Sequence, residues 1–199
     1  MFPEMKLSDF LEKIAAKTPT PGGGSVSAAV GAMGAALGVM TARYSDANDP
    51  EHALDEVKNE FLTLVDADAE AYGSVNSALA LPKDSDDTKR RRKEALQIAL
   101  GEASEVPLKG MMLGARGLRS LAELAPQCNK NLLSDLSGAT TFLEGALTGC
   151  GENVKINAAS LTDKVRRAKL EKEHARLEEE GKALSAKIRQ IIEGLTVKK

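Results

Sequence analysis

Apolar residues recur every three or four positions along most of the chain, which is the period of an amphipathic helix. Turns rich in proline, glycine, asparagine and aspartate separate these stretches. The predicted helices cover about residues 8–18, 25–44, 49–81, 87–125, 131–149 and 153–194. The pattern predicts an all-α fold in which residues 1–199 form a single domain, an antiparallel bundle of about five to six helices with a long C-terminal helix.

One carboxylate interrupts the apolar pattern of the helix predicted over 49–81. The stripe of that helix consists of Leu54, Val57, Phe61, Leu64, Tyr72, Val75 and Leu79. The next step after Leu64 falls on Asp68, where the period requires a core side chain. Two interpretations are open for this carboxylate: an ion pair with an arginine, or an acid or base in a cleft.

Other breaks in the pattern mark the second half of the chain. Pro107 is predicted to kink the helix over 87–125. The glycines on either side of Cys150 predict that one helix ends there and that another begins at Asn153. The last helix carries Leu170, Leu177, Leu184 and Ile191 seven residues apart, interrupted by His174 and Gly181. This spacing favours a long antiparallel or dimer-forming helix over a regular coiled coil.

The composition agrees with a helical protein of low net charge. The chain has 29 alanines and 25 leucines, against 22 valine, isoleucine and aromatic residues together, so helix formers dominate. The formal net charge is −2, and the chain therefore lacks a strong field for nucleic acid. The basic run 89–93 follows acidic residues and contains no aromatic residue, which favours a solvated helix face. We expect no nucleic-acid partner.

Cysteine usage and the N-terminus indicate a cytoplasmic protein. Cys128 and Cys150 are too few for a disulfide framework, and the first residues lack the pattern of a secretory signal. The uncharged run 26–42 consists mostly of small residues and is shorter than the ~20 strongly apolar residues of a membrane span. The cysteines and the two histidines lack the spacing of metal ligands. We therefore expect no membrane insertion and no metal.

The segment Pro19–Ser25 places three glycines and a hydroxyl directly before a predicted helix. Free backbone N–H groups and the positive end of the helix dipole meet at such a point, which suits an anion. The spacing fits neither a phosphate-binding loop with its lysine nor a dinucleotide fingerprint. The alternative interpretation is a flexible turn in which Ser25 caps the helix.

Three more polar residues stand out. Asp135 lies among apolar residues near a predicted helix start, where a capping role is the simpler interpretation. Asn153 and Asn157 are one helical turn apart and present two amides on one face. Capping or interhelix hydrogen bonds would explain these amides without a ligand.

Several segments together carry a family resemblance. They are 19–25 with 31–37; 66–72; 81–83 with Lys89, Arg92, Gln97 and 106–107; Ser134 and Asp135; and 153–157 with Asp163. In this order and spacing they resemble the cyclodeaminase/cyclohydrolase family of tetrahydrofolate enzymes. That family includes the C-terminal domain of formiminotransferase-cyclodeaminase and the methenyltetrahydrofolate cyclohydrolases.

The resemblance implies an all-helical homodimer that binds folate near the glycine turn, with no metal and no cofactor besides the tetrahydrofolate substrate. It assigns catalytic roles to Asp68 and Asp135, as charge stabiliser or base and as proton-transfer group, in either order. The substrate-binding residues that we expect on this basis are Pro21, Gly22, Gly23, Gly24, Ser25, Tyr72, Lys83, Arg92, Asn153 and Asn157.

The expected reaction is cyclodeamination of formiminotetrahydrofolate to methenyltetrahydrofolate and ammonia. One alternative is hydrolysis of methenyltetrahydrofolate to formyltetrahydrofolate. An alternative of another class is a catalytically silent helical dimer that only binds folate or a protein partner. It is kept open because the segment 45–49 lacks the basic stretch that the resemblance leads us to expect.

Overall fold

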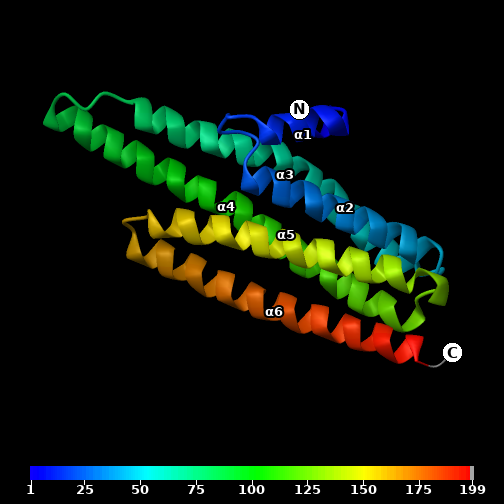
Figure 1. Ribbon diagram of the computed structural model, residues 1–199. Helices are drawn as coiled ribbons and strands as arrows, with labels where there is room; N and C mark the ends of the chain where they lie inside the picture. The colour runs from blue at the N-terminus through cyan, green and yellow to red at the C-terminus, as the bar shows by residue number, and fades with distance from the viewer. Residues whose placement is uncertain (198–199) are drawn as a thin grey trace.

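A computed structural model describes residues 1–197, and these residues form helices joined by short loops (Figure 1). The α-helices are α1 (Leu7–Ala15), α2 (Gly23–Arg43), α3 (Asn48–Ala80), α4 (Asp86–Leu124), α5 (Leu133–Ala159) and α6 (Lys164–Thr196). Three short 3-10 helices, Phe2–Glu4, Ala125–Gln127 and Lys130–Leu132, accompany them. No strand occurs in this part of the chain, so the predicted all-α bundle with a long C-terminal helix is confirmed.

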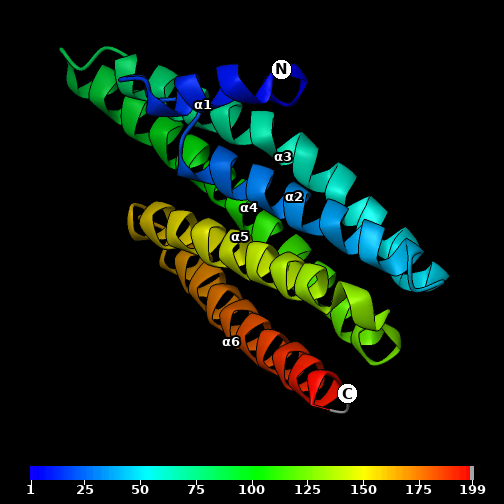
Figure 2. The ribbon, with the colours of Figure 1, turned by 45° about the vertical axis from the view of Figure 1, so that its right-hand side comes forward.

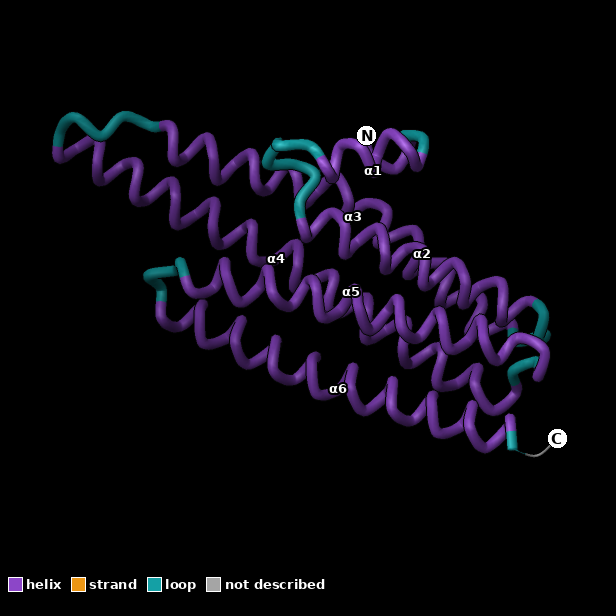
Figure 3. The backbone as a smooth tube through the Cα atoms, in the orientation of Figure 1, coloured by secondary structure: helices purple, strands orange, loops and turns teal. Residues whose placement is uncertain are grey.

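Helices α2 to α5 form the core of an antiparallel bundle, in which α2 packs on α3 and α5, and α4 packs on α3 and α5 (Figure 2). Helix α6 lies on the outside, against α4 and α5. The short α1 lies on the outside of the bundle, beside α2 and α3 (Figure 1). Loops occur only at helix ends, and the α3–α4 loop stands out beyond the end of α5 (Figure 3).

Glycines set the close approach of α2 to its neighbours. A Cβ atom at Gly31 would lie 2.6 Å from Cζ of the buried Phe61 ring on α3. One at Gly34 would lie 2.9 Å from Cβ of Phe142 on α5. The helix backbones can approach so closely only because these positions lack side chains. Helix α2 is also the one described helix with the length and apolar character of a membrane span, and it packs in the bundle core.

The prediction that a helix ends near Cys150 is wrong. Helix α5 continues through these glycines to Ala159, and the final helix begins at Lys164, capped by Asp163. A side chain at Gly149 would overlap the Ser27 hydroxyl of α2, and one at Gly151 would lie 2.9 Å from Nε2 of His174 on α6. The glycines are needed for helix packing on both sides of α5, and they do not terminate it.

The interruptions in the last apolar stripe have the same origin. His174 and Gly181 are buried on α6, and both contact α5: His174 packs on Gly151, and a Cβ at Gly181 would lie 2.8 Å from Leu147. Helix α6 therefore packs as an antiparallel helix on its own bundle, which is one of the two arrangements predicted from its stripe. Helix α4 continues through the buried Pro107 without a break.

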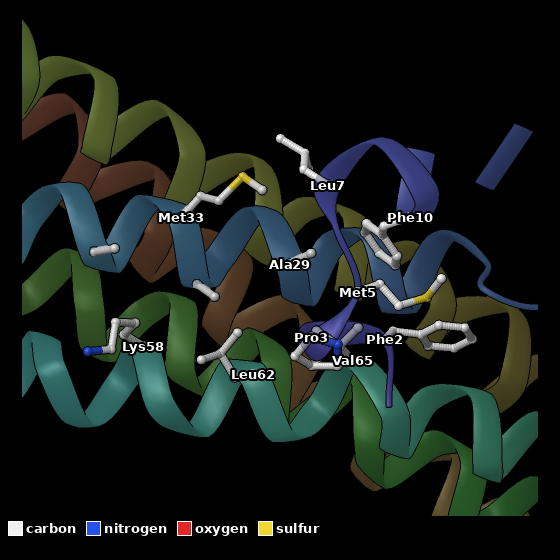
Figure 4. A pocket seen from close by; sticks show the side chains of 12 residues that line it. Phe2, Pro3, Met5, Leu7, Phe10, Ala29, Met33, Lys58, Leu62 and Val65 are labelled. Atoms are coloured by element: carbon white, nitrogen blue, oxygen red, sulfur yellow. The ribbon is translucent and has the colours of Figure 1, made fainter. Parts of the chain in front are cut away.

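An apolar pocket of about 310 Å³ lies between the N-terminal segment and α2 and α3 (Figure 4). Phe2 and Phe10 approach it from the N-terminal segment, Met33 from α2 and Leu62 from α3. Lys58 is the only charged residue in its lining. None of the predicted site residues lines this pocket, and its lining offers few polar groups to a ligand.

The packing at Gly31 gives a matched pair of substitutions. Gly31→Ala should lower the free energy of unfolding by about 1–3 kcal/mol, because the added methyl group meets the fully buried Phe61 ring. Gly73→Ala on α3 should raise it by up to ~1 kcal/mol, because no atom lies within 4 Å of the new methyl group. Urea unfolding followed by circular dichroism measures both. Equal effects of the two substitutions would contradict the packing role of Gly31.

Candidate active site

The first turn of α2 holds the carboxylate of Asp68. Ser25 donates two hydrogen bonds to Oδ2 of Asp68, from its backbone N–H at 2.8 Å and from its hydroxyl at 3.0 Å. No hydrogen bond from the described residues reaches Oδ1. The positive end of the α2 dipole and these two donors stabilise a negative charge on Asp68. No arginine pairs with this carboxylate, so the ion-pair interpretation is wrong.

Gly24 makes this contact possible. A Cβ atom at position 24 would overlap the Asp68 carboxylate, so any residue other than glycine would displace it. At Gly23, the nearest atom to a Cβ would be Nδ2 of Asn153 at 3.8 Å, an ordinary contact. The glycines of the turn therefore differ in role, and Gly24 is the position whose missing side chain lets Asp68 contact the helix.

Asp68 lines a pocket of about 300 Å³ between the glycine turn, α3, α4 and α5. This volume is at the lower end of the range for small-molecule sites. The lining residues are Pro19, Thr20, Gly22, Gly23, Gly24, Asp68, Tyr72, Val75, Leu100, Ala103, Asn153 and Asn157. The pocket thus combines apolar walls with one carboxylate and two amides.

The two amides have a fixed orientation. Nδ2 of Asn153 donates to the carbonyl of Gly149 at 2.9 Å, and Nδ2 of Asn157 donates to the carbonyl of Ala103 at 2.9 Å. Each amide uses one of its two N–H groups in this way, which leaves the second N–H and the oxygen for a ligand. The two amide oxygens have no hydrogen bond from the described residues. Together with Oδ1 of Asp68 they offer three acceptors. The polar chemistry of the pocket favours a ligand with N–H donors or a positive charge.

Cys150 is the nearest thiol to this site, and it is unreactive. Burial, with a further contribution from the negative charge of Asp68, raises the pKa of Cys150 to about 12. The thiol therefore stays protonated at neutral pH and cannot serve as a nucleophile. In residues 1–197, no group of three or more histidine, cysteine, aspartate or glutamate side chains is arranged to hold a metal ion.

Most residues predicted around the glycine turn meet at the pocket. Gly22, Gly23, Gly24, Tyr72, Asn153 and Asn157 line it together with Asp68. Ser25 is fully buried behind the carboxylate and acts through it, and Pro21 is buried just outside the lining. The expectation that Ser25 caps α2 is wrong: Gly22 is the cap residue, and the Ser25 side chain is turned to α3 instead.

The predicted basic residues lie away from the pocket lining. Lys83 is exposed in the loop between α3 and α4. Arg92 donates from Nε to the carbonyl of Leu79 at 3.0 Å, near the end of α3. In the basic run, Lys89, Arg90 and Arg91 form exposed pairs with Asp86 and Asp87. This arrangement agrees with a solvated helix face.

Asp135 lies at the opposite end of α5 from the pocket. It is half-buried in the first turn of α5. Burial raises the pKa of the nearby Cys128, a hydrogen bond with Ser45 lowers this pKa, and the negative charge of Asp135 adds to the increase. Eighteen residues separate Asp135 from Asn153 in the same helix, which corresponds to about 27 Å. A single chain does not bring Asp135 to the pocket of Asp68.

Some lining residues had no signal in the sequence. Val75 belongs to the predicted apolar stripe of α3. Leu100 and Ala103 come from α4, on which the sequence predicted only Arg92, and Arg92 lies outside the lining. Small or apolar residues on a helix carry no mark of a ligand, because the same residue types fill the core. The carbonyl of Ala103 gains its role only through the position of Asn157.

Comparison with known proteins identifies the family of this chain. The model of the family described as formiminotransferase-cyclodeaminase matches residues 6–176. The chain belongs to this family. The formiminotransferase-cyclodeaminase resemblance drawn from the motifs is therefore confirmed.

Relatives of two lengths occur in the formiminotransferase-cyclodeaminase family. Formimidoyltransferase-cyclodeaminase of Rattus norvegicus is 35% identical over 92% of this chain, which spans only 37% of that protein. Methenyltetrahydrofolate cyclohydrolase of Methylorubrum extorquens is 32% identical over 94% of this chain and 95% of its own length. A crystal structure of formiminotetrahydrofolate cyclodeaminase from Thermotoga maritima has a TM-score of 0.88 at 27% identity, covering 98% of this chain and all of the other.

Two glycine substitutions test the geometry of the turn. Gly24→Ala should lower the free energy of unfolding by about 1–3 kcal/mol, because the methyl group pushes Asp68 away from the Ser25 donors. Gly23→Ala should change it by less than ~0.5 kcal/mol, because its methyl group makes only an ordinary contact. Thermal and urea unfolding measure the difference. If both substitutions are tolerated equally, Asp68 does not depend on a side-chain-free position 24.

Proposed function

We propose that this protein is a tetrahydrofolate one-carbon enzyme that converts formiminotetrahydrofolate to methenyltetrahydrofolate and ammonia. The observation that carries this proposal is the carboxylate of Asp68, which lines the pocket with Asn153 and Asn157, is held on one oxygen by Ser25 and has no hydrogen bond from the described residues on the other. Further support comes from the similarity to a cyclodeaminase structure over nearly the whole chain.

The reaction makes a positive charge beside the pterin. One folate nitrogen attacks the carbon of the formimino group on the neighbouring nitrogen and loses its proton. The imino nitrogen takes up two protons, the bond from the carbon to this nitrogen breaks, and ammonia leaves. The product carries a cationic methenyl bridge. Oδ1 of Asp68 is suited to stabilise this charge or to accept the proton of the attacking nitrogen, since the two hydrogen bonds from Ser25 hold the carboxylate in place through Oδ2. The oxygens of Asn153 and Asn157 orient N–H groups of the ligand.

Hydrolysis of methenyltetrahydrofolate to formyltetrahydrofolate is the second candidate. It is favoured by the 32% identity to a methenyltetrahydrofolate cyclohydrolase that this chain matches over 95% of its length. Water then adds to the same cationic carbon, and Asp68 takes one proton from it. One of the two carbon–nitrogen bonds of the bridge then breaks as its nitrogen gains the remaining hydroxyl proton, which leaves the formyl group on the other nitrogen. Both reactions place a cation at the same point of the pocket, so the same residues serve either one.

The folate tail extends along α3 towards the α3–α4 loop in this proposal. Tyr72 and Val75 lie on successive turns of α3 beyond Asp68 and contact the aminobenzoyl group. The Arg92 guanidinium donates to the carbonyl of Leu79, which lies about 16 Å from Asp68 along α3. This position is near the reach of the glutamate carboxylates. Lys83 in the adjacent loop adds positive charge. Pro21 shapes the turn at the pterin end of the pocket.

The protein assembles as a homodimer in this proposal, through a face without charged side chains on α2 and α5. On α2 this face consists of Val26, Val30, Met33, Leu37 and Met40; on α5 it consists of Gly138, Thr141, Phe142, Gly145 and Thr148. We call it the uncharged face. Met33 and Phe142 are 50% and 43% exposed in a single chain. Burial of such large apolar side chains favours association.

The assay that tests the proposal offers the purified protein each of the two folates. Growth of methenyl absorbance with release of ammonia from formiminotetrahydrofolate identifies a cyclodeaminase. Decay of the methenyl absorbance above the spontaneous rate identifies a cyclohydrolase. A protein that binds folate and is inert towards both substrates is the silent binder, and the proposal is then wrong.

Asp68→Asn should lower turnover at least ~100-fold, because the amide keeps the shape of the side chain and loses its charge and its basicity. Asp66→Asn is the matched control: Asp66 lies half a turn away on α3 and accepts a hydrogen bond from the backbone N–H of Phe2, outside the pocket. Steady-state turnover is measured for both, with helical circular dichroism as the check on folding. Near-normal turnover in Asp68→Asn would exclude a chemical role of this carboxylate.

A further inference from the structure

We infer that each active site is completed by the second subunit, whose Asp135 reaches the pocket that contains Asp68. This inference rests on the proposed function and goes beyond it, because it makes the site a property of the dimer. It is carried by the register of α2 and α5, by the place of Asp135 on α5 and by the extent of the uncharged face.

Helices α2 and α5 run antiparallel with a constant register. Gly23 lies opposite Asn153, Ser27 opposite Gly149, and Gly34 opposite Phe142. Continued by two turns, this register places Asp135 beside the end of α2. The pocket and Asp135 therefore lie at opposite ends of the same helix pair.

Asp135 and Asn153 point to the same side of α5. The 18 residues between them make five full turns of an α-helix, so their side chains leave the helix in the same direction. Gly138, Phe142, Gly145 and Gly149 continue this line from Asp135 to the pocket. The line runs along the uncharged face. Figure 1 shows α2 in front of α3 and α5 in front of α4, and the short α1 lies beside α2.

A twofold axis through the middle of this face brings each end of the face in one subunit against the opposite end in the other. The α2 part of the face runs from Val26 to Met40, and its midpoint is Met33, which is opposite Phe142 and Leu143 on α5. A second copy turned about an axis at Met33 lays its α2 antiparallel on the first. The pocket at Gly24 then meets the far end of the other α2–α5 pair. The partner's Asp135 arrives within about one residue, or ~1.5 Å, of the level of Asp68.

The chemistry and size of the face fit a second copy of this chain. From Gly23 to Ala42 α2 has no charged residue, although 28% of the whole chain is charged. Two adjacent helices about 30 Å long present a plane of about 600 Å², and interdigitated side chains bury more than the plane area, close to the ~800 Å² per subunit of a stable dimer. Large residues such as Met33 and Phe142 alternate with small ones such as Ala36 and Gly145, as a self-complementary surface requires.

The second carboxylate supplies what the pocket of one chain lacks. In a single chain Asp68 is the only charged residue in the lining. Cyclodeamination needs one group that stabilises the cation and another that delivers a proton to the leaving ammonia. The partner's Asp135 takes the second role at the open side of the pocket, where Asn153 lies on the same line of α5.

A cysteine on the axis tests the geometry without any assay of activity. In Met33→Cys the two new thiols of a dimer meet at the axis, so mild oxidation should give a covalent dimer in high yield. Ile98→Cys is the control, since Ile98 is 62% exposed on α4 away from this face, and it should stay monomeric on a denaturing gel. The native Cys128 and Cys150 are buried and do not interfere. A monomer in solution that fails to cross-link, or that binds lipid vesicles through α2 instead, overturns the inference.

Complementation between two inactive variants tests the shared site. When Asp68→Asn and Asp135→Asn are produced together, a mixed dimer has one pocket with both carboxylates intact and one pocket with neither. Random pairing should restore about a quarter of the wild-type activity, whereas each variant alone stays at least ~100-fold below it. No recovery in cross-linked mixed dimers, or full activity of Asp135→Asn alone, overturns the inference. Wild-type protein that is inert towards both folates refutes the proposed function instead, and the Met33→Cys result then still decides the dimer geometry.

Discussion

The two hydrogen bonds from Ser25 to Asp68 tie the first turn of α2 to the middle of α3, and the site depends on this link. Every wall of the pocket is defined relative to it: the glycine turn precedes Ser25, Tyr72 follows Asp68 by one turn, and the amides of α5 lie across from Gly23. A negative charge at a helix N-terminus is electrostatically favourable, so the carboxylate that we propose for the chemistry also holds the helices in register. Stability and reactivity are coupled at one side chain.

Much of the fold could be predicted from the sequence, because apolar periodicity reports directly which face of a helix is buried. Asp68 was found as a break in that period, and its partner helix was found through the glycine turn. The end of α5 was predicted wrongly for a physical reason: glycine is used both to terminate helices and to let them touch, and Gly149 and Gly151 serve the second purpose. Ser25 was misjudged similarly, since a serine near a helix start caps it or bonds to a distant group.

The composition of the pocket was predictable only in part. Polar residues at unusual positions attract attention in a sequence, and these were Asp68, Asn153 and Asn157. Apolar walls such as Leu100 look like core residues, so only the packing of α4 against α3 and α5 identifies them. Asp135 stood out for the same reason as Asp68, yet one chain leaves it about 27 Å from the amides, a separation that no local pattern can express.

Helix α6 is attached to the outer surface of α4 and α5 and provides no residue to the pocket. The part of the chain that matches the family ends at residue 176, within the first half of α6. An outer helix that is constrained mainly where His174 meets Gly151 and Gly181 meets Leu147 can diverge in sequence elsewhere with little cost to the pocket. Variation among members of this family should therefore accumulate on α6, which makes it the natural place to attach a label or a neighbouring domain.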